Sequence, residues 1–425
     1  MAGGLVAVGA LVVVKPLLAA VVVVLVVIAA LVALARPLRI DHAYPAALLL
    51  LAGFVALPRV ATVGSYSGLA VLTIVIVLAA LPILLLRRRV RPAVPRPLLL
   101  FTAYTCVALV VAGPSSTGIQ NVLIFLAFIA AIAVTASGVR SQAEIPHTIV
   151  RAFDIAAWTG VGVLAALLAT GHGATPTDVL APRPFAIFAV LALAWALARM
   201  RVERRGGLLA AAAIVVIVVS LSRGEIVAVV LLLSLNWVGP GGAGRLVVAA
   251  VTLALLGAGL FYATEHVSAL HTRFYGGDQQ TLDGVRINTE GRVGVWQATW
   301  AHWKTSPILG HGPGDADHIS GLQGLDHPHN DFLRILDDSG LVGLALWLAG
   351  YFELMRQARR ADRESRSPTD IRVAWAAFLA LAGIGLIMLV DNPADYVFIM
   401  CPLGVLAGAA LGIRLRGLPA PGPVP

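Results

Sequence analysis

The sequence predicts an all-α polytopic membrane protein with about 12–14 transmembrane helices and one large extracytoplasmic loop that contains short interfacial helices. Of its residues, 59% are hydrophobic and only 12% are charged, whereas soluble domains carry about 25% charged residues. Runs such as 17–35, 69–86 and 247–262 are long and almost uncharged. These runs lack the period-two alternation of barrel strands, so we expect them to form helices.

The apolar periodicity divides the chain into four parts. We expect N-terminal transmembrane helices over 1–263, a large extracytoplasmic loop over 264–337, three C-terminal transmembrane helices over 338–413 and a disordered tail over 414–425. The individual spans are predicted near 17–35, 44–58, 66–86, 98–113, 119–137, 149–170, 183–199, 207–221, 224–238, 244–263, 338–358, 371–391 and 395–413, with 2–14 as a candidate for a further short one.

The basic residues predict the orientation. Of 31 lysines and arginines, 22 fall in one set of alternate loops, whereas the opposite short loops hold only Arg59, Arg183 and Arg223. Because basic loops remain cytoplasmic, the long loop 264–337 is expected on the outer face. This placement also argues against nucleic acid as the partner that the net charge of +9 would attract. Cys106 and Cys401 lie inside apolar spans, so neither a disulfide framework nor a cysteine zinc site is expected.

The long loop contains seven of the ten histidines, and any chemistry is expected there. Its segment 291–304 has helical spacing, with Trp296, Trp300 and Trp303 on one face, which is typical of a helix at the membrane–water boundary. Arg292 lies one turn before Trp296, at the end of this helix, where it could meet an anionic head group.

Two further segments of the loop are candidates for a site. Gly310, Gly312 and Gly314 stand at alternate positions, which permits either a plain turn or the close approach of a ligand to the backbone. His329 follows His327 and precedes Asn330, a residue that can cap a helix beginning at the membrane surface. An imidazole there is a competent proton acceptor, although a capping or packing role is equally open.

Two alternatives concern the charged and metal-binding side chains. A metal site built from His327, His329 and other loop histidines is disfavoured because no acidic residue stands at the spacing of a known zinc motif. Arg223 sits between two short spans, where it either pairs with Glu225 or clamps a lipid-linked phosphate.

Taken together, these segments resemble the core of the O-antigen ligase and O-antigen polymerase superfamily. The resemblance rests on Ser222-Arg223-Gly224 and on a series of about fifty residues. That series comprises Arg292, Trp296, Pro307, Gly310, Gly312, Gly314, His329, Asn330, Leu333, Gly340, Leu341 and Gly343. The single large outer loop in the C-terminal third, followed by three spans, also matches.

The resemblance implies a bacterial enzyme of the inner (plasma) membrane with its active site on the periplasmic face. It would transfer a glycan from a polyprenyl diphosphate, such as undecaprenyl diphosphate, to an acceptor hydroxyl of a glycan or glycolipid, with no cofactor or metal. Arg223 and Arg292 match the diphosphate-holding arginines and His329 the catalytic base, with Arg286 and His327 as the nearest competitors. A flippase or transporter is the alternative, which the position of Asp154, Glu353 and Asp391 at span ends disfavours.

Overall fold

The computed structural model describes five longer stretches of the chain: residues 40–52, 94–169, 182–237, 291–325 and 327–416. It adds short pieces at 62–63, 66–67, 76–77, 80, 251, 258–259, 261–262, 265–266, 268, 271, 280–282 and 285–287. The expected spans 2–14, 17–35, 66–86 and 244–263, and the tail beyond residue 416, lie wholly or largely outside these described residues.

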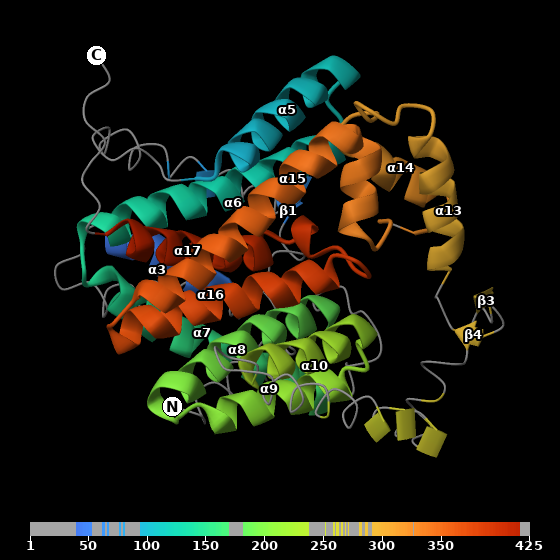
Figure 1. The fold of residues 1–425 in the computed structure, drawn as a ribbon. Coiled ribbons are helices and arrows are strands. Elements are labelled where there is room, and N and C mark those ends of the chain that lie inside the picture. Colours follow the sequence, from blue (N-terminus) through green and yellow to red (C-terminus); the bar gives the residue numbers. More distant parts are fainter. Residues whose placement is uncertain are drawn as a thin grey trace, which may run out of the picture.

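Helices dominate the described chain (Figure 1). They are α3 (Ile40–Ala52), α5 (Arg96–Ala112), α6 (Ser116–Ser141), α7 (Ile145–Ala169), α8 (Pro182–Glu203), α9 (Gly207–Val219), α10 (Arg223–Trp237), α13 (Arg292–Trp303), α14 (Asp315–Leu322), α15 (Asp331–Glu364), α16 (Pro368–Ile387), the 3-10 turn η2 (Pro393–Asp395) and α17 (Val397–Leu415). Two small antiparallel hairpins join β1 (Thr62–Val63) to β2 (Tyr66–Ser67) and β3 (Gln280–Leu282) to β4 (Val285–Ile287).

The prediction of an all-α polytopic membrane protein is confirmed. Among the described residues, five helices are long and apolar enough to cross a bilayer: 116–141, 145–166, 184–203, 368–387 and 397–415. The shorter apolar helices α5 and α9 occupy two further predicted spans. Helix α15 begins at Asp331, before its predicted span, and is broken at Gly340, which has φ 63°.

The bundle is held together in part by glycines that let helix backbones approach. Gly404, Gly408 and Gly412 follow one another at four-residue spacing on α17 and face α6. A Cβ atom on Gly408 would stand 2.6 Å from the carbonyl oxygen of Ile132. Small residues at this spacing are typical of close helix pairs in membranes, where van der Waals packing replaces the hydrophobic effect between helices.

Gly408→Ala is therefore expected to destabilise the bundle. The new methyl group would force α6 and α17 apart, at a cost of about 1–3 kcal/mol. Thermal unfolding of the purified protein in detergent measures the effect. Gly162→Ala on α7 is the matched control, because a Cβ atom there meets nothing within 4 Å. Equal melting temperatures for the two variants would contradict the proposed packing.

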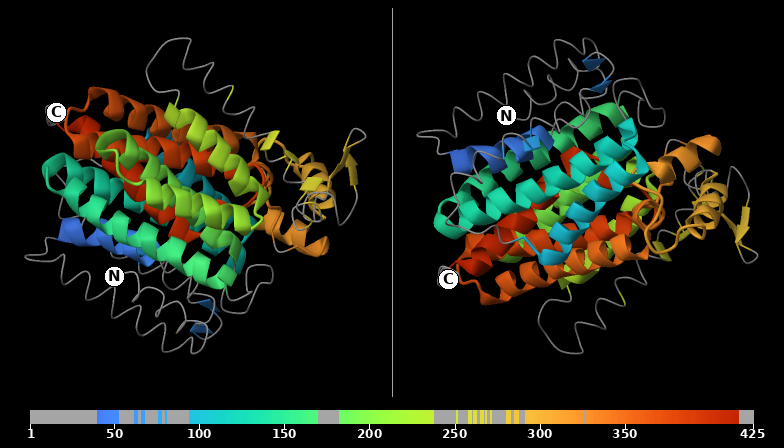
Figure 2. Two further views of the ribbon diagram at one scale, coloured as in Figure 1. Left: turned by 90° about the horizontal axis from the view of Figure 1, so that it is seen from below. Right: turned by 90° about the horizontal axis from the view of Figure 1, so that it is seen from above.

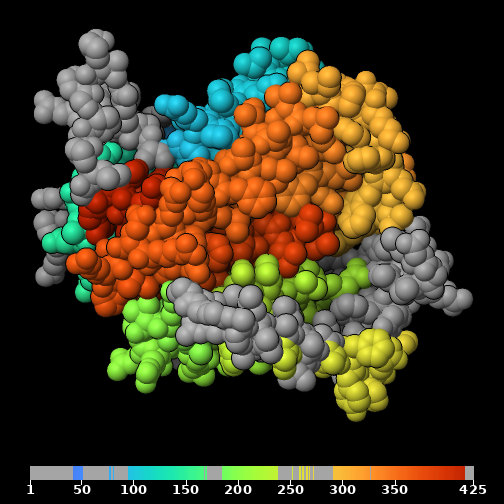
Figure 3. Space-filling model, viewed as in Figure 1, coloured from blue at the N-terminus to red at the C-terminus, as the bar shows by residue number. Residues whose placement is uncertain are grey.

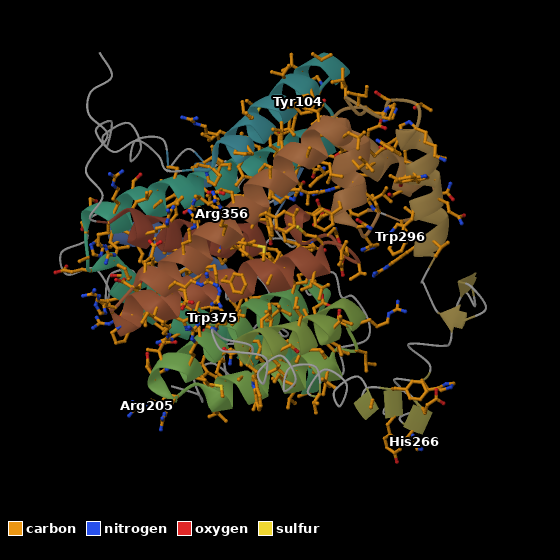
Figure 4. All side chains as sticks on the ribbon, viewed as in Figure 1. Tyr104, Arg205, His266, Trp296, Arg356 and Trp375 are labelled. Atoms are coloured by element: carbon orange, nitrogen blue, oxygen red, sulfur yellow. The ribbon has the colours of Figure 1, made fainter. Side chains whose placement is uncertain are left out.

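The two ends of the bundle differ. Arg201, Arg363 and Arg414 occupy the last turns of α8, α15 and α17. At the other end, α13 and α14 lie beside the start of α15, as two further views also show (Figure 2). The space-filling view shows α15 running along the surface from α13 and α14 toward the opposite end (Figure 3). Trp296 and Arg205 mark these two ends among the labelled side chains (Figure 4).

Candidate active site

The turn between α16 and η2 is the point at which three sequence-predicted site residues meet. Its Val390 carbonyl accepts a hydrogen bond from Arg292 Nη1. A Cβ atom on Gly224 would stand 2.7 Å from the Val390 side chain, so the start of α10, with Arg223, lies against the same residue. The next residue, Asp391, pairs with His329. Arg292 and His329 therefore contact one two-residue segment, and the start of α10, where Arg223 lies, packs beside it, although the three residues are far apart in the sequence.

His329 is held by its backbone as well as by its ring. Its φ of 50° lies in the left-handed region, an unfavourable conformation for a residue with a Cβ atom. The preceding Pro328 carbonyl accepts a 2.7 Å hydrogen bond from the Trp296 indole of α13. Strain of this kind persists where the surroundings fix the backbone, and it clusters at functional sites.

The buried carboxylate of Asp391 orients the His329 ring. His329 Nδ1 lies 3.2 Å from Asp391 Oδ1, which also accepts the backbone N–H of Asn392 at 2.9 Å. A carboxylate accepts hydrogen bonds, so Nδ1 carries the proton and Nε2 holds the lone pair. This arrangement fixes the tautomer in which Nε2 can act as a base.

Asn330 confirms the expected cap of α15. Its side chain accepts the Leu333 N–H at 2.9 Å. The next residue, Asp331, ties the helix to the α16–η2 turn, because its N–H donates to the Met388 carbonyl and its carboxylate accepts the Ala394 N–H, both at 2.8 Å. The cap therefore sets the position of His329 relative to Asp391.

His327 belongs to a different group of side chains. Its Nδ1 lies 3.1 Å from Asp317 Oδ1 and 3.4 Å from Asp395 Oδ2, and Arg334 pairs with Asp395. Burial opposes ionisation of Asp317, yet the hydrogen bond from His327 and the charge of Arg334 keep the pKa of this carboxyl below its usual value. These contacts connect α14, α15 and η2, and Asn392 links them to Asp391, because its backbone N–H donates to Asp391 and its side-chain amide donates to Asp395.

The alternating glycines pack against the break in α15. Gly310 and Gly312 have φ of 76° and 111°. A Cβ atom on Gly310 would stand 2.5 Å from the backbone around Ser339, so only glycine fits there. The loop donates hydrogen bonds from His311 N and Gly312 N to carbonyls of α15. Gly314 completes the loop, with its N–H 3.1 Å from Asp338 Oδ2. The sequence left open whether these glycines form a plain turn or let a ligand approach the backbone. These contacts favour the plain turn.

Arg286 lies on β4 and is paired with Thr281 of β3 in the small hairpin. Its side chain is outside the description of the structure. Its role as a competitor for the diphosphate therefore stays a prediction.

Comparison with known families gives a match over part of the chain. The family model described as O-antigen ligase matches residues 208–348. Over this segment the chain is similar to the O-antigen ligase family. The match begins in α9 and ends in α15, so it includes Arg223, Arg292 and His329 and confirms the resemblance to the O-antigen ligase and polymerase superfamily. No curated protein matches the chain.

Asp391 lies beyond the segment that matches the family and was not predicted as a site residue. The sequence did contain one signal for a role of Asp391. An acidic residue at the end of a membrane span costs free energy unless it has a partner. The identity of that partner could not be read from local pattern, since His329 and Asp391 are 62 positions apart.

If Asp391 positions His329, Asp391→Asn is expected to lower kcat by about 10–100-fold, because an amide holds either tautomer of the imidazole. The KM for the donor is expected to change little, since the arginines are untouched. Steady-state kinetics separate these two effects. A loss confined to KM would argue that Asp391 serves donor binding instead.

Proposed function

We propose that this protein is a glycosyltransferase that moves a glycan from a polyprenyl-diphosphate carrier to an acceptor hydroxyl on the extracytoplasmic face. The match to the O-antigen ligase family supports glycosyl transfer of the ligase or polymerase type. The observation that carries the proposal is the His329–Asp391 pair beside Arg292, all assembled on the turn after α16.

The proposed reaction is a single displacement. His329 Nε2 accepts the proton of the acceptor hydroxyl as its oxygen attacks the anomeric carbon of the donor glycan. The bond from that carbon to the diphosphate oxygen breaks, and the polyprenyl diphosphate leaves with both bonding electrons. One displacement inverts the anomeric centre. The leaving group is already good, so the protein has to orient the hydroxyl and neutralise developing charge.

Arg223 and Arg292 are the proposed diphosphate ligands. Arg292 offers N–H donors in a planar fork, a geometry that suits the oxygens of a diphosphate. Arg223 is the first residue of α10, where the partial positive charge of the helix N-terminus adds to the attraction for an anion. This chemistry requires no metal ion and no nucleotide.

An in vitro transfer assay tests the proposal. Purified protein in detergent would receive a polyprenyl-diphosphate-linked glycan and the acceptor from the native host, with and without EDTA. We expect release of polyprenyl diphosphate that depends on the acceptor, with initial rates unchanged directly after EDTA is added. Product length then separates a ligase from a polymerase. No release despite confirmed donor binding, together with donor movement across proteoliposomes, would instead indicate a flippase.

The proposed orientation makes its own prediction. His318 is exposed on α14, and Arg205 is exposed at the opposite end of the bundle. In intact cells, a membrane-impermeant maleimide is expected to label a His318→Cys variant, and an Arg205→Cys variant only after the membrane is permeabilised. The unmodified protein, with Cys106 and Cys401, gives the background. The reverse labelling pattern would place the site in the cytoplasm.

A further inference from the structure

A second group of side chains converges at the end of α13 that is remote from Arg292. His302, His311, Asp315 and Asp337 each offer one nitrogen or oxygen atom, and these four atoms all lie within 4.8 Å of one another. They come from four segments: α13, the glycine loop, the first turn of α14 and α15 before its break. We call this group the two-His two-Asp cluster.

Three distances within the cluster lie close to the spacing of ligands around a tetrahedral metal ion. Bonds of about 2.0–2.1 Å from zinc to nitrogen or oxygen place neighbouring ligands about 3.3 Å apart. His302 Nδ1 lies 3.3 Å from Asp315 Oδ2 and 3.1 Å from Asp337 Oδ1. His311 Nδ1 lies 3.6 Å from the same Asp337 oxygen. Nitrogen and oxygen ligands in this mixture suit zinc better than calcium or magnesium, which prefer oxygen alone.

The hydrogen bonds of Thr305 show which His311 nitrogen can bind a cation. The Thr305 hydroxyl lies 2.8 Å from the His302 carbonyl, which can only accept, so the hydroxyl proton is used there. His311 Nε2, 2.8 Å from the same hydroxyl, must then donate to it. In a neutral ring this leaves a lone pair on Nδ1. That lone pair faces the Asp337 carboxylate and its carbonyl at 3.6 and 3.4 Å.

His311 Nδ1, the Asp337 carboxylate and the Asp337 carbonyl can only accept hydrogen bonds, and they therefore face one another without a shared proton. A cation between them would supply the positive charge that their lone pairs require. Asp337 is fully buried, and the buried Asp315 Oδ2 accepts no hydrogen bond among the described residues. Two carboxylates and two neutral imidazoles carry a charge of −2, which one divalent ion balances. The neighbouring group of Asp317, His327 and Asp395 differs, because Arg334 already supplies a positive charge to Asp395.

We propose that the two-His two-Asp cluster binds one divalent transition-metal ion, best matched by Zn²⁺, as a structural site. Thr305 would orient His311 by accepting a hydrogen bond from its Nε2, as partners of metal-binding histidines do. Arg292 and His302 are ten residues apart on α13, about 15 Å along the helix. The ion would therefore link α13, the glycine loop, α14 and α15 near the active site, without contacting the reacting atoms.

Metal content tests the proposal directly. The purified full-length protein would be incubated with Zn²⁺, dialysed against metal-free buffer and analysed by mass spectrometry for zinc per chain. We expect one ion per chain in the wild type and in the matched control His318→Ala, whose histidine is exposed on α14. His302→Ala and His311→Ala are expected to hold at least about tenfold less zinc. Wild-type zinc content in either of these variants would overturn the proposal.

A second measurement keeps the test valid if the alanine variants fold poorly. Co²⁺ alone, added to the metal-free wild type, is expected to give the visible absorption of tetrahedral cobalt, and added Zn²⁺ is expected to abolish it. Zn²⁺ is also expected to raise the melting temperature of the wild type and of His318→Ala. If the wild type gives no cobalt spectrum and no zinc-dependent shift, a proton on His311 supplies that positive charge and the metal site does not exist. Neither readout depends on glycosyl transfer.

Discussion

His329→Ala is expected to lower the rate of glycan transfer by about 10²–10⁴-fold, the usual contribution of a general base. The imidazole is oriented by Asp391 through Nδ1 and held by the hydrogen bond from Trp296 to the Pro328 carbonyl. Alanine removes the proton acceptor while leaving both arginines in place. Donor binding is therefore expected to persist, and the loss should appear in kcat.

The matched control for this variant is His318→Ala, which removes an exposed histidine of the same loop. His329→Gln adds a second comparison, because glutamine fills similar space without a basic nitrogen. Polyprenyl diphosphate release would be measured for all three, and gel filtration in detergent would establish that each is folded. Full activity of a folded His329→Ala variant would show that the base lies elsewhere.

Arg292→Ala is expected to lower kcat/KM by about 10²–10³-fold, the effect of removing one donor that stabilises developing negative charge. The variant also loses the hydrogen bond to the Val390 carbonyl, so part of the effect could come from movement of the turn. Arg292→Lys distinguishes the two, since lysine restores the charge without the planar fork. We expect it to recover only part of the activity.

Donor affinity, measured with a non-transferable polyprenyl diphosphate, is the readout that assigns Arg292 to the diphosphate. It should fall in Arg292→Ala and stay unchanged in Asp391→Asn. Arg223→Ala is expected to behave like Arg292→Ala, because both are proposed diphosphate ligands and Gly224, next to Arg223, packs against Val390. Unchanged donor affinity in both arginine variants would show that the diphosphate does not bind at these arginines.

The sequence was sufficient for the fold class because long apolar runs have few physical alternatives in a membrane. It also gave α13 and the cap of α15, since helical spacing and an asparagine before an apolar run are local signals. Helix α15 starts at Asp331, as that cap predicts, seven residues before the expected span 338–358. Its first turns hold Asp331, Asp337 and Asp338, which make no apolar pattern and are stabilised by partners distant in sequence.

The site was only partly predictable for the same reason. Arg223, Arg292 and His329 carry the family resemblance, whereas Asp391 follows an apolar helix and shows its role only once α16 and α15 are packed together. Trp296 was expected to anchor a helix at the membrane surface. That role stays a prediction; the Trp296 indole donates to the Pro328 carbonyl, while Trp300 is exposed. Equal spacing on one face did not reveal which indole faces inward.

The position of Asp391 limits how this domain could be exchanged between proteins. The segment that matches the family, 208–348, contains the proposed base and both arginines, but the carboxylate that orients the base is supplied by the hairpin formed by α16 and α17. A chimaera that grafts only that segment onto another membrane scaffold would inherit a histidine without its partner. Transplantable activity is therefore expected to require the chain through residue 395, where Asp395 still pairs with Arg334.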